Sequence, residues 1–147
     1  MERRLPFVES WSILHLENIG FARNRWAQLF HDHAHCFEPI AAAARVDLRV
    51  ETEPVELSID PDGLRQVILN LLDNAVKHGG SGGVVQVQLA MLDGETRLTV
   101  DDAGPGVPSD WRDRVFEPFA RAERNAVSGA GIGLSVVRDI VASHAGR

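Results

Sequence analysis

The stretch DPDGLRQVILNLLDNAVKH, residues 60–78, decides the fold of this 147-residue chain. Asp60 followed by Pro61 is a typical helix start and Gly79-Gly80 a typical helix stop, so this pattern predicts one helix between them. Six apolar side chains recur at helical spacing, which predicts a helix packed on a core. They are Leu64, Val67, Ile68, Leu71, Leu72 and Ala75.

The same helix carries a separate polar stripe. Asn70, Asn74, Lys77 and His78 follow one another at i, i+4, i+7 and i+8, so they share one side of the helix. Asn is unfavourable in a helix interior, but its amide offers an oxygen to a metal and donors to a phosphate. The stripe therefore indicates either a binding surface or a solvated edge, and its spacing alone does not choose between them.

Patterns outside this helix predict helices packed on a mixed sheet. Asp93-Gly94 separates two alternating stretches and predicts a hairpin. The expected strands are residues 46–51, 55–59, 84–92 and 96–102. The expected helices are residues 5–19, 26–44 with a kink or restart at Pro39, a short one near 109–115, and 131–144. This order predicts an α/β (α+β) two-layer fold.

Asp102 follows the last expected strand, in the sequence Asp101-Asp102-Ala103-Gly104-Pro105-Gly106. Because side chains alternate along a strand, Asp102 continues the inward row of Leu98 and Val100, whereas Asp101 points to the other face. An inward carboxylate needs a partner, and a ligand amine would serve. A solvated aspartate in a strand-ending turn is the alternative interpretation.

A glycine-rich segment opens the last expected helix, from Ser128 to Ser135. Backbone amides at a helix N-terminus suit a phosphate group. The segment does not have the GxxxxGK[ST] pattern of a Walker loop, and it does not directly follow a strand as a dinucleotide-binding fingerprint would. By itself it predicts little.

Taken in order, these motifs resemble those of the sensor histidine kinase catalytic and ATP-binding domain, of the GHKL or Bergerat-fold ATPase superfamily. Asn70–Lys77 resembles the N box and Asp102–Gly106 the G1 box, while Phe116–Phe119 and Gly129–Leu134 resemble the F and G2 boxes. The resemblance covers roughly residues 45–146. It implies a mixed sheet covered on one face by helices, and ATP and Mg²⁺ as cofactors.

The resemblance also implies roles for individual residues. Asn74 would coordinate Mg²⁺, Asn70 and Lys77 would act at the phosphates as the catalytic pair, and Asp102 would accept a hydrogen bond from the adenine amino group. Residues 120–130 would form a lid, with Phe116 and Phe119 as hydrophobic anchors. Arg121 and Arg124 are candidates for the γ-phosphate by their charge and location alone. The remaining expected nucleotide-binding residues are His78, Gly104, Gly106, Gly129, Gly131, Ile132, Gly133 and Leu134.

Asn70 favours a kinase over an ATPase. ATP-hydrolysing members of the superfamily carry Glu at this place as the general base for water, and an amide cannot take a proton. We therefore expect transfer of the γ-phosphate to a histidine on a separate domain or chain. A regulatory nucleotide-binding module without transfer activity, or a GHKL ATPase, is the alternative.

No phosphoacceptor histidine is assigned, because His31-Asp32 lies only 39 positions before Asn70. Residues 1–24 are expected to hold the end of a dimerisation-domain helix and a linker, and residues 25–147 the catalytic domain. Members of the family usually continue with two further strands after the last helix, so we expect an unpaired sheet edge here. The histidines and Cys36 near residues 31–36 are interpreted as a solvated helix face rather than a metal site.

The amino-acid composition limits which classes of partner and which cellular location we expect. A net charge of −6 without a basic stripe argues against nucleic acid, and a single cysteine fits a reducing cytoplasm. No apolar run reaches the ~18 residues of a membrane span. The expected partners are a phosphoacceptor (dimerisation) domain and a response regulator, with a homodimer in the full-length protein and a cytoplasmic location.

Overall fold

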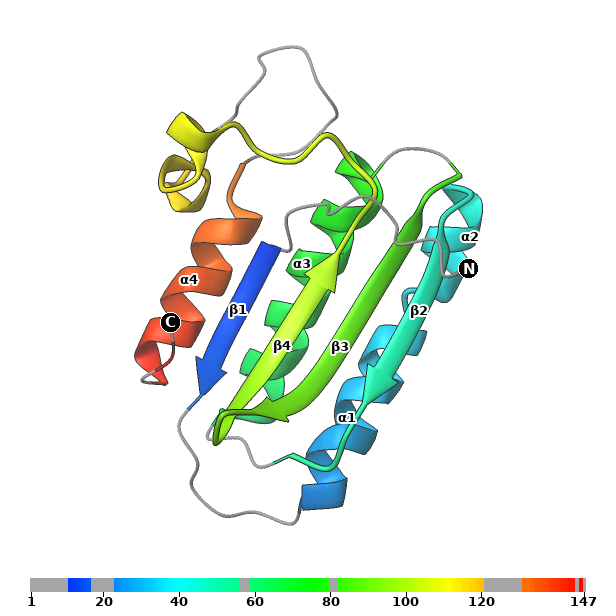
Figure 1. Cartoon of the computed structure of the whole chain (residues 1–147), viewed down its shortest axis with the longest axis vertical. Helices are drawn as coiled ribbons and strands as arrows, with labels where there is room; N and C mark the ends of the chain where they lie inside the picture. Colours follow the sequence, from blue (N-terminus) through cyan, green and yellow to red (C-terminus); the bar gives the residue numbers. More distant parts are fainter. Residues whose placement is uncertain are drawn as a thin grey trace.

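The computed structural model describes residues 11–16, 23–55, 59–79, 82–120, 131–144 and 146. Ten elements follow one another along these residues (Figure 1). They are β1 (Trp11–Leu16), α1 (Arg23–His35), α2 (Glu38–Ala43), β2 (Asp47–Thr52), α3 (Pro61–His78), β3 (Val84–Leu92), β4 (Glu95–Asp101), the 3₁₀ turns η1 (Ser109–Trp111) and η2 (Arg114–Phe116), and α4 (Gly133–Ser143).

The strands form one mixed sheet in the order β1-β4-β3-β2. β2 runs parallel to β3, whereas β4 is antiparallel to both of its neighbours. β3 and β4 form the predicted hairpin, and Asp93 and Gly94 have φ angles of 52° and 82° at its turn. Positive φ at both central residues is typical of a type I′ turn, which matches the twist of the flanking strands.

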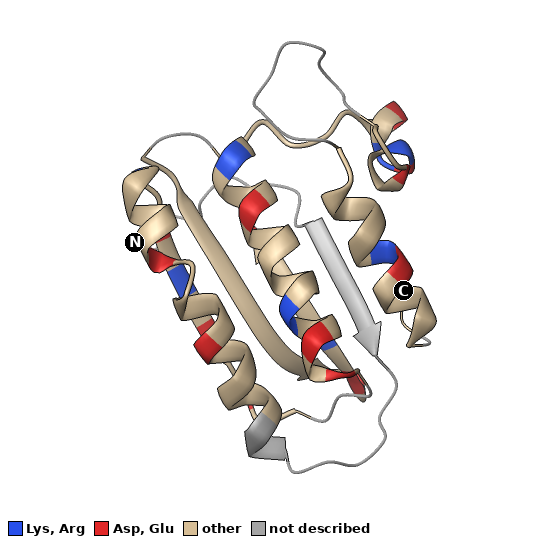
Figure 2. Ribbon diagram, turned by 180° about the vertical axis from the view of Figure 1, so that it is seen from behind, with Lys and Arg blue, Asp and Glu red and all other residues tan. Residues whose placement is uncertain are grey.

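Helices cover one face of this sheet, as predicted. Val85, Val87 and Leu89 of β3 are buried toward the helices, opposite Leu98 and Val100 of β4. α1, α3 and α4 lie side by side on that face (Figure 2). The two-layer α/β fold is therefore confirmed.

α3 forms the centre of the helix layer, and its ends are those that the sequence predicts. Asp60 caps the helix, because Oδ1 accepts a hydrogen bond of 2.8 Å from the Gly63 N–H, and Pro61 is the first helical residue. The apolar face predicted from helical spacing, Leu64 to Ala75, is buried. Local pattern and tertiary packing agree along this element.

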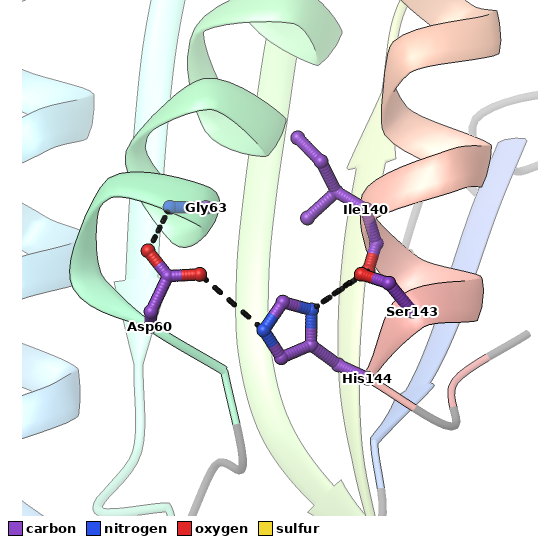
Figure 3. Close-up of polar contacts among 5 residues, drawn as sticks. All are labelled: Asp60, Gly63, Ile140, Ser143 and His144. Carbon is purple, nitrogen blue, oxygen red and sulfur yellow. Dashed lines mark hydrogen bonds and ion pairs between the residues drawn. The ribbon is translucent and has the colours of Figure 1, made fainter.

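α4 packs antiparallel on α3, and side chains join the two at one end. Nε2 of His144 lies 3.3 Å from Oδ2 of Asp60, and Nδ1 of His144 lies 2.8 Å from the Ile140 carbonyl oxygen (Figure 3). A Cβ on Gly63 would lie 3.4 Å from Cγ2 of Ile140, so the Ile140 side chain packs closely against the first turn of α3. The N-terminus of α3 is thereby fixed to the C-terminus of α4.

The helix predicted for residues 5–19 is wrong over Trp11–Leu16, which form β1 instead. β1 pairs antiparallel with β4, with an irregular register between Trp11 and Leu14. The backbone hydrogen bonds offered by the edge of β4 outweigh the apolar spacing of a short segment. The rest of that helix lies outside the described residues, and the boundary between residues 24 and 25 stays a prediction. β1 pairs with the outer edge of β4, so the edge strands of the described sheet are β1 and β2.

Two further predictions need correction. The helix expected over residues 26–44 is two helices, α1 and α2, with the restart near Pro39 that the sequence indicated. The strand expected over residues 55–59 is absent at its described ends, where Val55 has no regular structure and Ile59 lies in a bend. Both side chains are nevertheless buried, so the apolar pattern marked the core correctly.

Candidate functional site

The C-terminal end of α3 meets the segment that follows β4. A Cβ on Gly104 would lie 2.4 Å from the His78 carbonyl oxygen, which is closer than any side chain can come. A Cβ on Gly79 would lie 3.2 Å from Cβ of Asp102. Glycine at both positions therefore allows the end of α3 and the Asp102–Gly104 turn to touch.

Asp102 is held in place within this contact. Its Oδ1 accepts a hydrogen bond of 2.7 Å from the Gly104 N–H, and its side chain is partly buried. β4 ends one residue earlier, at Asp101, and Cβ of Asp102 lies against Gly79 at the end of α3, on the helix-covered side of the sheet, as predicted. A carboxylate has lone pairs for several donors, so it can also accept from a ligand amine.

Asn70 lies at the contact between α3 and α4. A Cβ on Gly133 would lie 3.6 Å from Oδ1 of Asn70, so the first turn of α4 passes next to this amide. Among the residues described, Nδ2 of Asn70 has no hydrogen-bond partner although it is buried. A buried amide without a partner is costly, and a ligand oxygen would satisfy it.

The other members of the polar stripe follow toward the end of α3. Asn74 is partly buried, and Lys77 and His78 are exposed. Nζ of Lys77 forms an ion pair of 2.5 Å with Oδ2 of Asp73, one turn earlier. In this structure the ammonium is therefore neutralised by its own helix, a contact that sequence reasoning missed although the i,i+4 spacing indicates it.

The first turn of α4 has no side-chain cap. Ile132 stands at the cap position and makes no capping hydrogen bond, and α4 has no acidic residue in its first turn. The hydroxyl of Ser135 donates to the Ile132 carbonyl oxygen at 2.7 Å. Uncapped backbone N–H groups at a helix start attract an anion.

Phe119 and Gly131 close the base of the loop that the sequence identified as a lid. The Phe119 N–H donates to the Gly131 carbonyl oxygen at 2.9 Å, which joins the two ends of the loop. Phe119 is 73% exposed, so the prediction that its side chain is a hydrophobic anchor is wrong, and the backbone makes the anchoring contact. Gly129, Arg121 and Arg124 lie outside the described residues.

The predicted site residues thus divide into two contacting groups. Gly104 lies against His78 and Asp102 against Gly79 at the end of α3, and Asn70 lies against Gly133, with Leu134 packed next to the core. Gly106 has a φ of 75° and Gly131 a φ of 70°, conformations that favour glycine. Sequence reasoning missed Gly79, which it interpreted only as a helix stop, although the helix end must leave room for Asp102.

Residues 59–147 match the family of histidine kinase-, DNA gyrase B-, and HSP90-like ATPases. The chain belongs to this family. The match begins with α3 and spans β3, β4 and α4, and so includes all the site residues above. The resemblance to sensor histidine kinase catalytic domains is therefore confirmed, as the relatives below also indicate.

This chain is 42% identical over 145 residues to the adaptive-response sensory kinase SasA of Nostoc sp. (strain PCC 7120). The matched residues cover 97% of this chain and 33% of that protein. The chain thus spans about a third of the length of that relative. Its fold matches the mycobacterial sensor histidine kinase MprB with a TM-score of 0.71 and 32% identity, over 83% of this chain and 78% of that one. It also matches full-length ShkA in complex with AMPPNP, with a TM-score of 0.68 and 29% identity, over 87% and 26% of the two chains.

None of the described helices combines the length and the apolar character needed to span a bilayer.

Proposed function

We propose that this domain binds Mg-ATP and transfers its γ-phosphate to a histidine on a separate domain or chain. The observation that carries the proposal is the buried Nδ2 of Asn70, which has no partner among the described residues, next to the uncapped start of α4. Both features offer N–H groups to an anion at one place. A bound nucleotide analogue in the similar ShkA structure supports ATP as that anion's source.

The adenine end of the site would lie at Asp102. Its Oδ1 is occupied by the Gly104 N–H, which fixes the carboxylate while leaving further lone pairs for the adenine amino group. Gly104 and Gly106 keep side chains out of this turn, so a flat base can approach the backbone. His78 lies against the same turn through its carbonyl group.

The phosphate end would lie between α3 and α4. Asn74 would hold Mg²⁺ through its amide oxygen, which fits the preference of this ion for oxygen ligands with water completing the shell. The ion would offset the phosphate charge during transfer. Asn70 and the backbone of Gly131, Ile132, Gly133 and Leu134 would bind phosphate oxygens. Lys77 would exchange Asp73 for a phosphate oxygen, because both are anionic partners within reach of one flexible side chain.

Transfer rather than hydrolysis is favoured by Asn70. Its amide can donate to a phosphate oxygen but cannot remove a proton from water. The alternatives are a nucleotide-binding module without transfer activity and an ATPase of the same family. Each predicts a different fate for the γ-phosphate.

The partners of the whole protein are part of this proposal. The histidine would be supplied by a dimerisation domain, whose phosphate would pass to a response regulator, and the full-length protein would be a homodimer in the cytoplasm. Nucleic acid is not among the proposed partners, because the chain carries a net charge of −6.

The test combines the chain, a separate histidine-containing dimerisation domain and ATP labelled at the γ-phosphate. We expect acid-labile, base-stable label on the acceptor domain, and its loss when the acceptor histidine is replaced by Gln. ATP binding without label transfer would favour the regulatory module. Rapid phosphate release without an acceptor would favour the ATPase.

A further inference from the structure

The C-terminal end of α1 brings two imidazole rings into contact, far along the chain from the nucleotide site. Nε2 of His31 lies 2.8 Å from Nε2 of His35, with ring centroids 4.0 Å apart and ring planes tilted by 55°. Both rings are partly buried, and their i,i+4 spacing places them on one side of the helix. On the helix face that the sequence predicted to be solvated, these two rings therefore contact each other.

A carboxylate orients one ring of this pair. Nδ1 of His35 is hydrogen-bonded to Oε1 of Glu38, the first residue of α2. Because a carboxylate only accepts, Nδ1 carries the proton and Nε2 of neutral His35 presents its lone pair to His31. A carboxylate behind one ring nitrogen is the usual support of a metal-binding imidazole, since it fixes the tautomer and the ring orientation.

We propose that His31 and His35 bind a divalent transition-metal ion, such as Zn²⁺, through their two Nε2 atoms. The ion would replace the proton that now lies between these atoms. Zn–N bonds of about 2.0–2.1 Å at a tetrahedral angle separate two ligand nitrogens by roughly 3.3 Å. The pair at 2.8 Å therefore needs to open by only about half an ångström.

The electrostatic setting favours a cation at this position. α1 ends at His35, so the last carbonyl groups of the helix present partial negative charge near the pair. Oδ1 of Asp32 accepts from Gln28 and is occupied elsewhere. Within the described residues no group of three or more His, Cys, Asp or Glu side chains is placed to hold a metal, so water would complete the coordination.

The experiment measures thermal unfolding of the 147-residue chain with added ZnCl₂ and no nucleotide, together with calorimetric titration of Zn²⁺. Zn²⁺ should raise the unfolding temperature of the unmodified chain, and EDTA should reverse the rise. His31→Asn and His35→Asn should abolish the response. Glu38→Gln should weaken the apparent Kd about tenfold, because it removes only the orienting carboxylate.

Two variants serve as matched controls. His33 lies on the same helix but points away from the pair, so His33→Asn should respond to Zn²⁺ like the unmodified chain. Cys36 is a neighbouring exposed thiol, and Cys36→Ser should also leave the response intact. An unmodified chain without any response to Zn²⁺ would overturn the proposal. A response that survives in His31→Asn, or that is lost in Cys36→Ser, would overturn it as well.

Discussion

A Cβ built on Gly133 would lie 3.6 Å from Oδ1 of Asn70, an ordinary van der Waals distance, so the first turn of α4 passes next to the side chain whose buried Nδ2 has no partner among the described residues. The second contact between these helices, Asp60 with His144, lies ten residues earlier on α3 and eleven later on α4. At ~1.5 Å per residue both intervals span about 15–17 Å, so the two contacts fix the α3–α4 packing at both ends.

Gly133→Ala should separate binding from folding. A methyl group at 3.6 Å from Asn70 is an ordinary contact, so the free energy of unfolding should change by less than about 1 kcal/mol. The same methyl group lies where we place a phosphate oxygen, so affinity for Mg-ATP should fall. Urea unfolding and calorimetric titration of one preparation measure both. Undiminished affinity would place the phosphates elsewhere.

Gly104→Ala should instead damage the fold of the site. Its Cβ would meet the His78 carbonyl oxygen at 2.4 Å, and backbone atoms cannot move aside cheaply. We expect a loss of about 1–3 kcal/mol in the free energy of unfolding, measured in urea. Gly82→Ala is the control: its φ of 81° is strained for alanine but nothing lies within 4 Å, so its cost should stay near 1 kcal/mol. Equal losses in the two variants would contradict the close contact.

Asp73→Asn should release Lys77 from its ion pair. The two side chains are 49% and 37% exposed, so stability should change by less than about 0.5 kcal/mol. Because the ammonium no longer has a competing carboxylate, affinity for Mg-ATP should stay the same or rise. Titrations of Asp73→Asn and Lys77→Ala side by side provide the measurement. A fall as large as that in Lys77→Ala would show that Asp73 itself serves the nucleotide.

Asp60 should contribute to the loss of stability in acid. The Gly63 N–H, and to a lesser extent His144, hold the pKa of the Asp60 carboxyl below its ordinary value of 3.8. A group with a lowered folded-state pKa stabilises the fold above its unfolded pKa, and this contribution disappears as pH falls through the folded value. The window is therefore below about pH 4.

Asp60→Asn keeps a good helix cap but cannot ionise. Its urea midpoint should fall less steeply than that of the unmodified chain as pH is lowered from about 6 to about 3. Glu53→Gln, at an exposed carboxyl after β2, should follow the unmodified chain. Parallel curves for Asp60→Asn and the unmodified chain would contradict a role for this carboxyl.

The parts predicted correctly from sequence are those that local pattern determines. The Asp60 cap, the apolar face of α3 and the Asp93-Gly94 turn each depend on residues within one element, and the structure confirms them. Asp102 was predicted to face inward because strand alternation is equally local, and β4 does end just before it.

β1 could not be predicted in this way. Its conformation is set by the edge of β4, which is distant in sequence, and its own apolar spacing fits a helix as well as a strand. The Phe119 side chain was misjudged for a related reason. A large apolar residue is a reasonable anchor by composition, but the Phe119–Gly131 backbone hydrogen bond closes the loop and leaves that side chain exposed.

Calorimetric titration of Mg-ATP into the unmodified chain and Asp102→Asn tests the central claim most directly. The amide introduced by Asp102→Asn would keep an oxygen for the Gly104 N–H, so the fold should persist, but the charged acceptor for the adenine amino group is lost. We predict that Kd rises at least about tenfold, as expected for one lost hydrogen bond to a charged group. Asp101→Asn, on the opposite face of β4, should bind normally. Unchanged affinity in Asp102→Asn, or an equal loss in Asp101→Asn, would contradict the account.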